Sequence, residues 1–104
     1  MGRIDWNKSS SEIINKIRAF VEYPVAFFTY EGANVKIYKA EIATGYEGKP
    51  GFVYQANPKE KIVIGTKDGA IRIEKIQFPG KKAMDTKSFL MGNSFEEKIT
   101  LDNE

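Results

Sequence analysis

Apolar residues near the start of the chain recur with the period of a helix. Between residues 13 and 21 they fall every three or four positions, which places them on one helix face. They are Ile13, Ile14, Ile17, Phe20 and Val21. Ser9 stands three residues before Glu12, the capping-box spacing that satisfies the unpaired amides of a first helical turn. The pattern predicts a helix that begins near Ser9, keeps its apolar face to about residue 21 and ends at Pro24, with Trp6 folded back onto that face.

Beyond Pro24 the pattern changes to short runs of aromatic and β-branched residues between turn residues, which is typical of strands. We predict strands at about Ala26–Tyr30, Val35–Ala43, Phe52–Ala56, Ile62–Thr66 and Ile71–Phe78. Asp68 and Gly69 predict a hairpin between the last two strands, because both residues tolerate the positive φ of a tight primed turn. Asp85 is the expected cap of a short helix that Gly92 stops. The residues that follow could add one more short strand.

The two longest predicted strands each change their inward phase once. In the first, apolar residues fall at 35 and 37 and then at 40 and 42, so the phase slips near Tyr38 and Lys39. In the second they fall at 71 and 73 and then at 76 and 78, with the slip at Glu74 and Lys75. Such slips indicate bulges and strong coiling, which a few strands need to close into a small barrel. We therefore predict a mainly β fold, a five- to six-stranded OB-like Greek-key barrel with an N-terminal α-helix and a short C-terminal helix.

The composition fits this architecture. The chain has 104 residues, of which 41% are hydrophobic and 29% charged, and this suits one domain with one core. Its longest apolar stretches fall far short of the roughly 20 residues that a membrane-spanning helix needs. The first residues have no apolar segment behind their charge, so we expect no secretory signal and a cytoplasmic location.

The lack of cysteine and histidine limits the chemistry most strongly. It removes disulfides, thiolate nucleophiles, imidazole bases and nearly all transition-metal sites. Glu96 and Glu97 fall in a tail, the serines at 9 to 11 form a cap, and no helix follows the glycines at 45, 48 and 51. We therefore expect no catalytic residue, no cofactor and no metal in this chain.

The net charge of +2 is unevenly spread along the chain. Residues 59–82 hold seven basic and three acidic side chains, whereas residues 83–104 hold two basic and five acidic ones. A polyanionic partner would therefore prefer the first of these segments. Lys81 and Lys82 follow a Pro-Gly turn in that segment. They could contact phosphates, or they could be ordinary solvated lysines.

Further basic residues lie on the two long strands. Arg72 and Lys75 are on the second, and Lys36 points outward from the first. Together they could form a basic stripe on one barrel face, or they could be offset by Glu41 and Glu74 in cross-strand pairs. Exposed tyrosines of the strands could stack on bases, but packing is the favoured interpretation because a small barrel needs large side chains.

Several motifs are similar, in the same order, to the C-terminal domain of methionyl-tRNA formyltransferases. They are Gly2-Arg3-Ile4-Asp5-Trp6, Ile17-Arg18-Ala19-Phe20, Val35-Lys36-Ile37, Lys49-Pro50-Gly51, Asp68-Gly69-Ala70-Ile71 and Gln77-Phe78-Pro79-Gly80-Lys81-Lys82-Ala83-Met84. The resemblance fades after Gly92. It implies one domain over residues 1–104, with 1–8 as the end of an interdomain linker and 93–104 as a tail, in an excised fragment or in a gene for this module alone.

The resemblance also implies a non-catalytic accessory domain. Such a domain would position initiator methionyl-tRNA while a separate catalytic domain, in cis or in trans, transfers the formyl group from 10-formyltetrahydrofolate. The candidate tRNA contacts are Lys81, Lys82, Arg72, Lys75 and Lys36.

Two alternative functions stay open. The first is a structural barrel of a sugar-nucleotide or folate formyltransferase that binds no RNA. The second is a protein-interaction module that docks onto a catalytic subunit through a surface formed by Trp6, Ile13 and Phe20.

Overall fold

The structure is a computed structural model and describes residues 2–19 and 25–101. These residues contain two helices and six strands. In chain order they are α1 (Ser10–Ala19), β1 (Phe27–Tyr30), β2 (Ala33–Ala43), β3 (Val53–Asn57), β4 (Lys61–Gly65), β5 (Ala70–Gln77), β6 (Met84–Asp85) and α2 (Thr86–Gly92). All five predicted strands are present, each with its ends within two residues of the prediction, and β6 is a further short strand.

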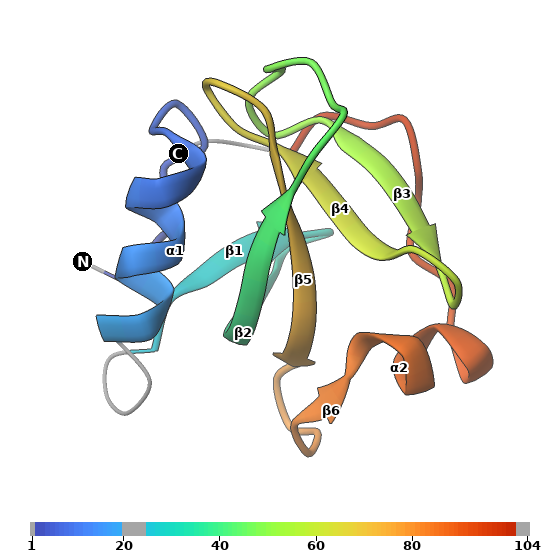
Figure 1. The fold of residues 1–104 in the computed structure, drawn as a ribbon. Helices are drawn as coiled ribbons and strands as arrows, with labels where there is room; N and C mark the ends of the chain where they lie inside the picture. The colour runs from blue at the N-terminus through green and yellow to red at the C-terminus, as the bar shows by residue number, and fades with distance from the viewer. Residues whose placement is uncertain (1, 20–24, 102–104) are drawn as a thin grey trace.

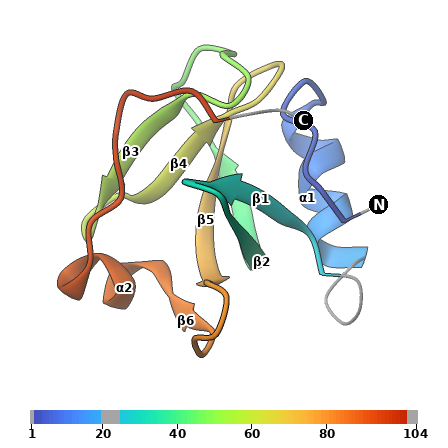
Figure 2. The ribbon, with the colours of Figure 1, turned by 180° about the vertical axis from the view of Figure 1, so that it is seen from behind.

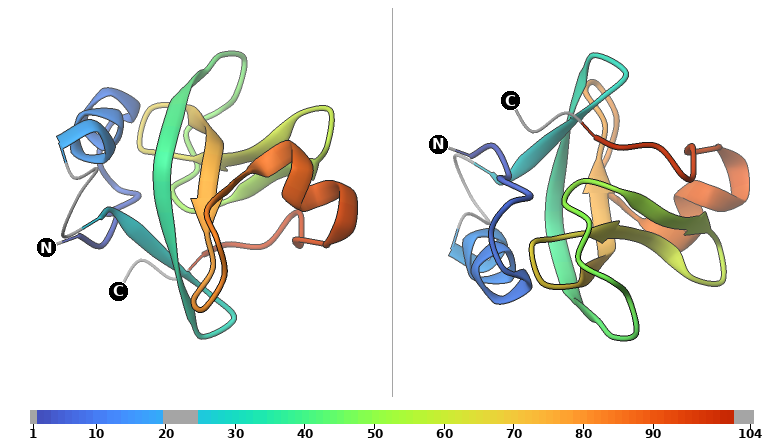
Figure 3. Two further views of the ribbon diagram at one scale, coloured as in Figure 1. Left: turned by 90° about the horizontal axis from the view of Figure 1, so that it is seen from below. Right: turned by 90° about the horizontal axis from the view of Figure 1, so that it is seen from above.

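The strands form one antiparallel sheet in the order β1-β2-β5-β4-β3, with β6 paired to the C-terminal end of β5. This sheet curls into a half barrel (Figure 1). α1 lies beside β1 and β2, and α2 lies at the opposite side, next to β6 and below β3 and β4 (Figure 2). In the views of Figure 3, β2 and β5 cross the middle of the molecule between these two sides. The mainly β fold with an N-terminal helix and a short C-terminal helix is confirmed.

α1 begins at the predicted capping box. The Glu12 amide donates to Ser9 Oγ and the Ser9 amide donates to Glu12 Oε1, each over 3.1 Å. The inner face of α1 is buried in the main hydrophobic core together with Trp6, which is fully buried. The buried residues of that face are Ile13, Ile14 and Ile17. The rest of the predicted helix, Phe20, Val21 and the stop at Pro24, lies outside the described residues.

The phase changes predicted for the two long strands are confirmed, and they lie opposite one another. The register shifts on both sides of Lys39 in β2, where Lys75 of β5 is its partner. The successive partners are Ile37 with Ile76, Lys39 with Lys75, and Ala40 with Ile73. Because both strands slip at the same place, Ile37 and Ala40 stay buried on either side of the slip while the two lysines are exposed. Ile42, which the predicted phase also directs inward, is 50% exposed.

The predicted hairpin joins β4 to β5, but its turn is not the one expected from Asp68 and Gly69. The Thr66 amide donates to the Gly69 carbonyl over 2.8 Å, so the turn is centred one residue earlier, and neither Asp68 nor Gly69 has a positive φ. The reason is a tertiary contact. The Asp68 carboxylate accepts hydrogen bonds from the Ser10 amide (2.9 Å) and from Thr66 Oγ1 (3.2 Å), which fixes the turn against the start of α1.

Both ends of the described chain contribute side chains to the core. Ile4 is buried near the start, and Phe95 and Leu101 are buried near the end. In place of a last strand, an isolated antiparallel bridge joins Thr100 to Phe52. The linker and tail that the resemblance implies therefore include residues packed into the domain.

α2 begins at the predicted cap. The Ser88 amide donates to Asp85 Oδ1 over 2.9 Å, and Gly92 is the last helical residue. Leu90 is buried in the core and Phe89 packs against it. Within the described residues, neither α1 nor α2 has the length and apolar character that crossing a membrane requires.

Candidate nucleic-acid interface

Three exposed lysines lie on the outer side of the paired strands β2 and β5. Lys36 stands opposite Gln77, and Lys39 stands opposite Lys75. Residues directly opposite in an antiparallel pair point to the same side of the sheet, and so do residues two apart along a strand. Lys36, Lys39 and Lys75 therefore share one side of the sheet, which we call the basic face.

The charges of the basic face are only partly balanced by the protein. Lys39 and Lys75 repel one another, since like charges directly opposite in a strand pair are unfavourable. Partial burial raises the pKa of the Glu74 carboxyl, but the hydrogen bond from Lys61 and the charges of Lys61 and Lys39 outweigh burial and hold this pKa below its usual value. Glu74 itself is ion-paired with Lys61 over 2.5 Å. Among the described residues, Lys36, Lys39 and Lys75 form no ion pair.

Lys81 and Lys82 are exposed on the turn that joins β5 to β6, which we call the lysine turn. The turn is held by two hydrogen bonds, from the Lys81 amide to the Phe78 carbonyl (3.1 Å) and from Gln77 Nε2 to the Lys81 carbonyl (2.7 Å). Gly80 has a φ of 74°, a conformation that favours glycine. The two lysines are therefore presented to solvent from a turn with a defined conformation.

A shallow groove connects this turn to the basic face. It has a volume of about 310 Å³ and lies between Lys36 of β2 and the start of the turn. Its lining residues are Asn34, Lys36, Gln77, Phe78, Pro79 and Gly80. Of the tRNA contacts that the sequence suggested, Lys36 therefore borders a groove that reaches the turn of Lys81 and Lys82, and Lys75 lies on the same side of the sheet as Lys36.

Arg72, the fifth suggested contact, is engaged with carboxylates. Its Nε donates to the Glu60 carbonyl and its Nη2 donates to Glu60 Oε1, each over 3.1 Å. Its Nη1 lies 3.8 Å from Glu41 Oε2. The cross-strand pairing with Glu41 that the sequence left open is therefore present for Arg72, whereas Glu74 pairs with Lys61 rather than with Lys75.

Sequence reasoning did not select Lys39 as a candidate. The sequence identified this residue only as the place where β2 changes phase. The strand register then showed that Lys39 lies opposite Lys75, so that its charge adds to the basic face. A lysine at a bulge between two buried residues is the signal that could have indicated an outward-facing contact.

Glu97, a carboxylate of the acidic tail, is held at the end of β3. Glu97 Oε2 accepts hydrogen bonds from the Ala56 amide (2.7 Å) and from Asn57 Nδ2 (3.3 Å), so this carboxylate is bound to the end of β3. Among the described residues, neither Glu96 nor Glu97 forms an ion pair with Lys81 or Lys82, and both lysines are exposed.

Two of the three residues suggested for docking onto a catalytic subunit are not exposed. Trp6 and Ile13 have exposed fractions of 0% and 2% and are packed in the core, and Phe20 lies outside the described residues. That hypothesis is therefore wrong for Trp6 and Ile13, because both are packed in the protein's own interior.

In the part of the chain that is described, no three carboxylates come together as a metal site.

The family match and the similar relatives agree, because both are formyltransferases. Residues 1–94 match the family described as formyl transferase, C-terminal domain. The chain is 40% identical over 105 residues to the methionyl-tRNA formyltransferase of Alkaliphilus metalliredigens, with 100% of this chain and 33% of that protein covered. It is 40% identical over 103 residues to that of Clostridium tetani, covering 98% of this chain and 33% of that protein. The chain thus spans about a third of the length of these relatives.

Solved structures show the same fold. HypX from Aquifex aeolicus, determined in complex with tetrahydrofolic acid, superposes with a TM-score of 0.67 at 26% sequence identity. The match covers 86% of this chain and 16% of HypX. The likeness is therefore to one part of a much longer protein.

Proposed function

This chain belongs to the formyl transferase C-terminal domain family, and we propose its function on that basis. It would serve as the accessory RNA-binding domain of a methionyl-tRNA formyltransferase. In this role it holds initiator methionyl-tRNA so that the aminoacyl end reaches a catalytic domain, in cis or in trans, that uses 10-formyltetrahydrofolate. The work is positional, because phosphate contacts fix orientation and do no chemistry. We assign the curled sheet to the OB-like class and the protein to the cytoplasm.

The observation that carries this proposal is the set of exposed lysines on the basic face and on the lysine turn, between which a groove runs from Lys36 to the turn. Its lysines form no ion pair with the described residues, so a phosphate backbone can displace their counterions. The proposed contacts are Lys36, Lys39, Lys75, Lys81 and Lys82, with Arg72 as a weaker member. Arg72 contributes less because the Glu41 and Glu60 carboxylates compete with phosphate for its guanidinium.

The test is the salt dependence of tRNA binding by a Lys81→Gln, Lys82→Gln double variant. Each lost phosphate contact lowers the slope of log affinity against log salt by roughly 0.7 to 0.9, so we expect the slope to fall by about 1.5. A Lys59→Gln, Lys67→Gln double variant removes the same charge from exposed positions in two other turns and should change the slope far less. Unchanged affinity and slope in the first variant would remove both lysines from the interface.

The second candidate function is a structural barrel that binds no RNA. The observation that favours it is the likeness to HypX, whose structure was determined in complex with tetrahydrofolic acid. The two candidates differ in a single measurement. If the isolated chain shows no salt-dependent binding to any RNA, the accessory role in tRNA positioning fails and the structural role stands.

A further inference from the structure

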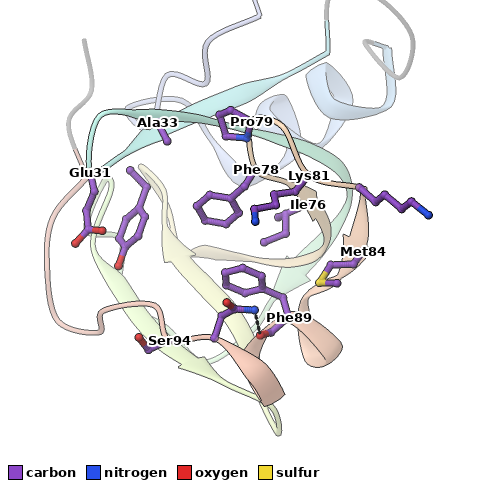
Figure 4. Close-up of a pocket in the computed structure, with 12 residues that line it drawn as sticks. Glu31, Ala33, Ile76, Phe78, Pro79, Lys81, Met84, Phe89 and Ser94 are labelled. Atoms are coloured by element: carbon purple, nitrogen blue, oxygen red, sulfur yellow. Dashed lines mark hydrogen bonds between the residues drawn. The ribbon is translucent and has the colours of Figure 1, made fainter.

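A hollow of about 640 Å³ opens beside the lysine turn (Figure 4). Its walls come from the β1–β2 hairpin, the β5–β6 turn and α2, so three segments far apart in the sequence build it. They contribute, among others, Tyr30, Glu31, Phe78, Lys81 and Phe89. The volume falls within the range of about 300 to 1,000 Å³ that is usual for small-ligand sites.

One side of the hollow is aromatic. The Phe78 and Phe89 rings are stacked, with centroids 5.0 Å apart and planes 10° apart. Tyr30 meets the Phe78 ring edge-on at 6.4 Å and 84°. Phe78 and Phe89 are only partly buried, and Figure 4 shows both rings directed into the hollow. The hollow therefore has an aromatic, apolar wall against which a nucleobase can pack.

Positive and negative side chains lie on different segments of the rim of the hollow. Lys81 and Lys82 line it from the β5–β6 turn, and Figure 4 shows Lys81 extending over the opening beside Phe78. Glu31 lines it from the β1–β2 turn. A phosphate would be drawn to the lysines and repelled by the Glu31 carboxylate, which can accept hydrogen bonds from the edge of a base. The hollow also shares Phe78 and Pro79 with the groove that leads to Lys36.

We propose that this hollow binds one unpaired nucleotide of the RNA that lies along the basic face. The base packs against Phe78 and Phe89, and the flanking phosphates contact Lys81 and Lys82. The inference rests on the proposed function and adds a distinction to it. The basic face alone holds any phosphate backbone, whereas an aromatic hollow accepts only a base that is not paired within a helix. An RNA with an unpaired nucleotide is therefore preferred over a continuous duplex.

The test compares two RNAs in the same buffer, a stem with a single-nucleotide bulge and the same stem without the bulge. Wild-type protein should bind the bulged RNA more tightly. A Phe89→Leu variant keeps an apolar side chain but loses the ring, and it should lose about tenfold in affinity for the bulged RNA while binding the unbulged stem unchanged. Phe52→Leu is the matched control, since Phe52 is another partly buried phenylalanine outside the hollow, and it should retain the preference.

A second measurement does not depend on any variant folding well. Uridine 5′-monophosphate is titrated into wild-type protein, and the ring-proton resonances of Phe78 and Phe89 are followed by NMR. We expect both to shift in a saturable way while the resonances of Phe52 stay in place.

The failure of this inference can be told apart from that of the proposed function. If the Lys81→Gln, Lys82→Gln variant loses salt-dependent binding but Phe89→Leu binds both RNAs as wild type does, the hollow is not a nucleotide site and the phosphate surface stands. If wild-type protein binds neither RNA, both proposals fall. If Phe89→Leu weakens only association with a formyltransferase catalytic domain, the hollow is a protein-docking site and the nucleotide is ruled out.

Discussion

Gly65, the last residue of β4, lies where two backbone segments meet without room for a side chain. Its amide donates to the Phe52 carbonyl (2.8 Å) and its carbonyl accepts from the Gly51 amide (2.9 Å). A Cβ at this position would collide with the carbonyl oxygen of Lys49. The loop before β3 can therefore approach β4 only because the residue is glycine.

Gly65→Ala should lower the free energy of unfolding by about 1 to 3 kcal/mol, since the backbone of Lys49 must move. Denaturant unfolding followed by tryptophan fluorescence gives this value. Gly92→Ala is the matched control, because a Cβ at this last position of α2 meets open space. It should leave stability the same or raise it slightly. Equal effects at the two glycines would show that the contact with Lys49 is unimportant.

Asp68 links the acid stability of the protein to the turn between β4 and β5. The hydrogen bond from the Ser10 amide, aided by Thr66, holds the pKa of the Asp68 carboxyl below its ordinary value of 3.8. Because the pKa is lowered in the folded state, its contribution is fully present above the unfolded value. It is lost as the pH falls through the lower folded value.

Asp68→Asn should therefore be less stable than wild type at neutral pH, and its stability should fall less steeply as the pH drops below about 4. The midpoint of urea unfolding, measured across this range, reports the difference. Parallel curves for the two proteins would mean that Asp68 does not contribute to acid unfolding.

At the scale of elements, strand β5 carries two cations with different roles. Arg72 is a structural cation, and Lys75 is a proposed RNA contact. Arg72 is bound to Glu60 and Glu41, and its side chain is 24% exposed, whereas Lys75 is exposed and forms no ion pair with the described residues. The same change of charge on one strand should consequently have two different effects.

Arg72→Gln should lower stability by up to about 1 kcal/mol and reduce the salt slope of RNA binding only slightly. Lys75→Gln should leave stability nearly unchanged and reduce the slope by roughly 0.7 to 0.9. Thermal unfolding and filter binding at several salt concentrations measure the two quantities. The reverse ranking of the two variants in RNA binding would assign the contact to Arg72.

At the scale of the whole molecule, the chain spans about a third of the length of the methionyl-tRNA formyltransferases that it resembles. We expect the isolated chain to transfer no formyl group to methionyl-tRNA. A chimera that joins it to the remaining two thirds of the Alkaliphilus metalliredigens relative, which is 40% identical over this region, should be active.

In that chimera, Lys81→Gln, Lys82→Gln should raise KM for tRNA about tenfold and leave kcat nearly unchanged, because the lysines bind ground state and transition state equally. Lys59→Gln, Lys67→Gln serves again as the control. Steady-state formylation assays separate the two constants. A loss confined to kcat would contradict a purely positional role.

The sequence alone was sufficient for features that depend on neighbouring residues. The capping box of Ser9 and Glu12, the Asp85 cap and the phase slips at Lys39 and Lys75 all follow from local hydrogen bonding and side-chain periodicity, and each is present. The family resemblance, carried by motifs spread along the chain, is confirmed by the match over residues 1–94.

Only the tertiary structure decided which charges act together. Strand register, set between residues more than thirty positions apart, placed Lys39 opposite Lys75 and Arg72 beside Glu41. The contact of Asp68 with Ser10 moved a turn by one residue, and the meeting of two turns with α2 created the hollow at Phe78 and Phe89. Periodicity along the chain fixes which way a side chain points, but the partner across space depends on how distant segments pack.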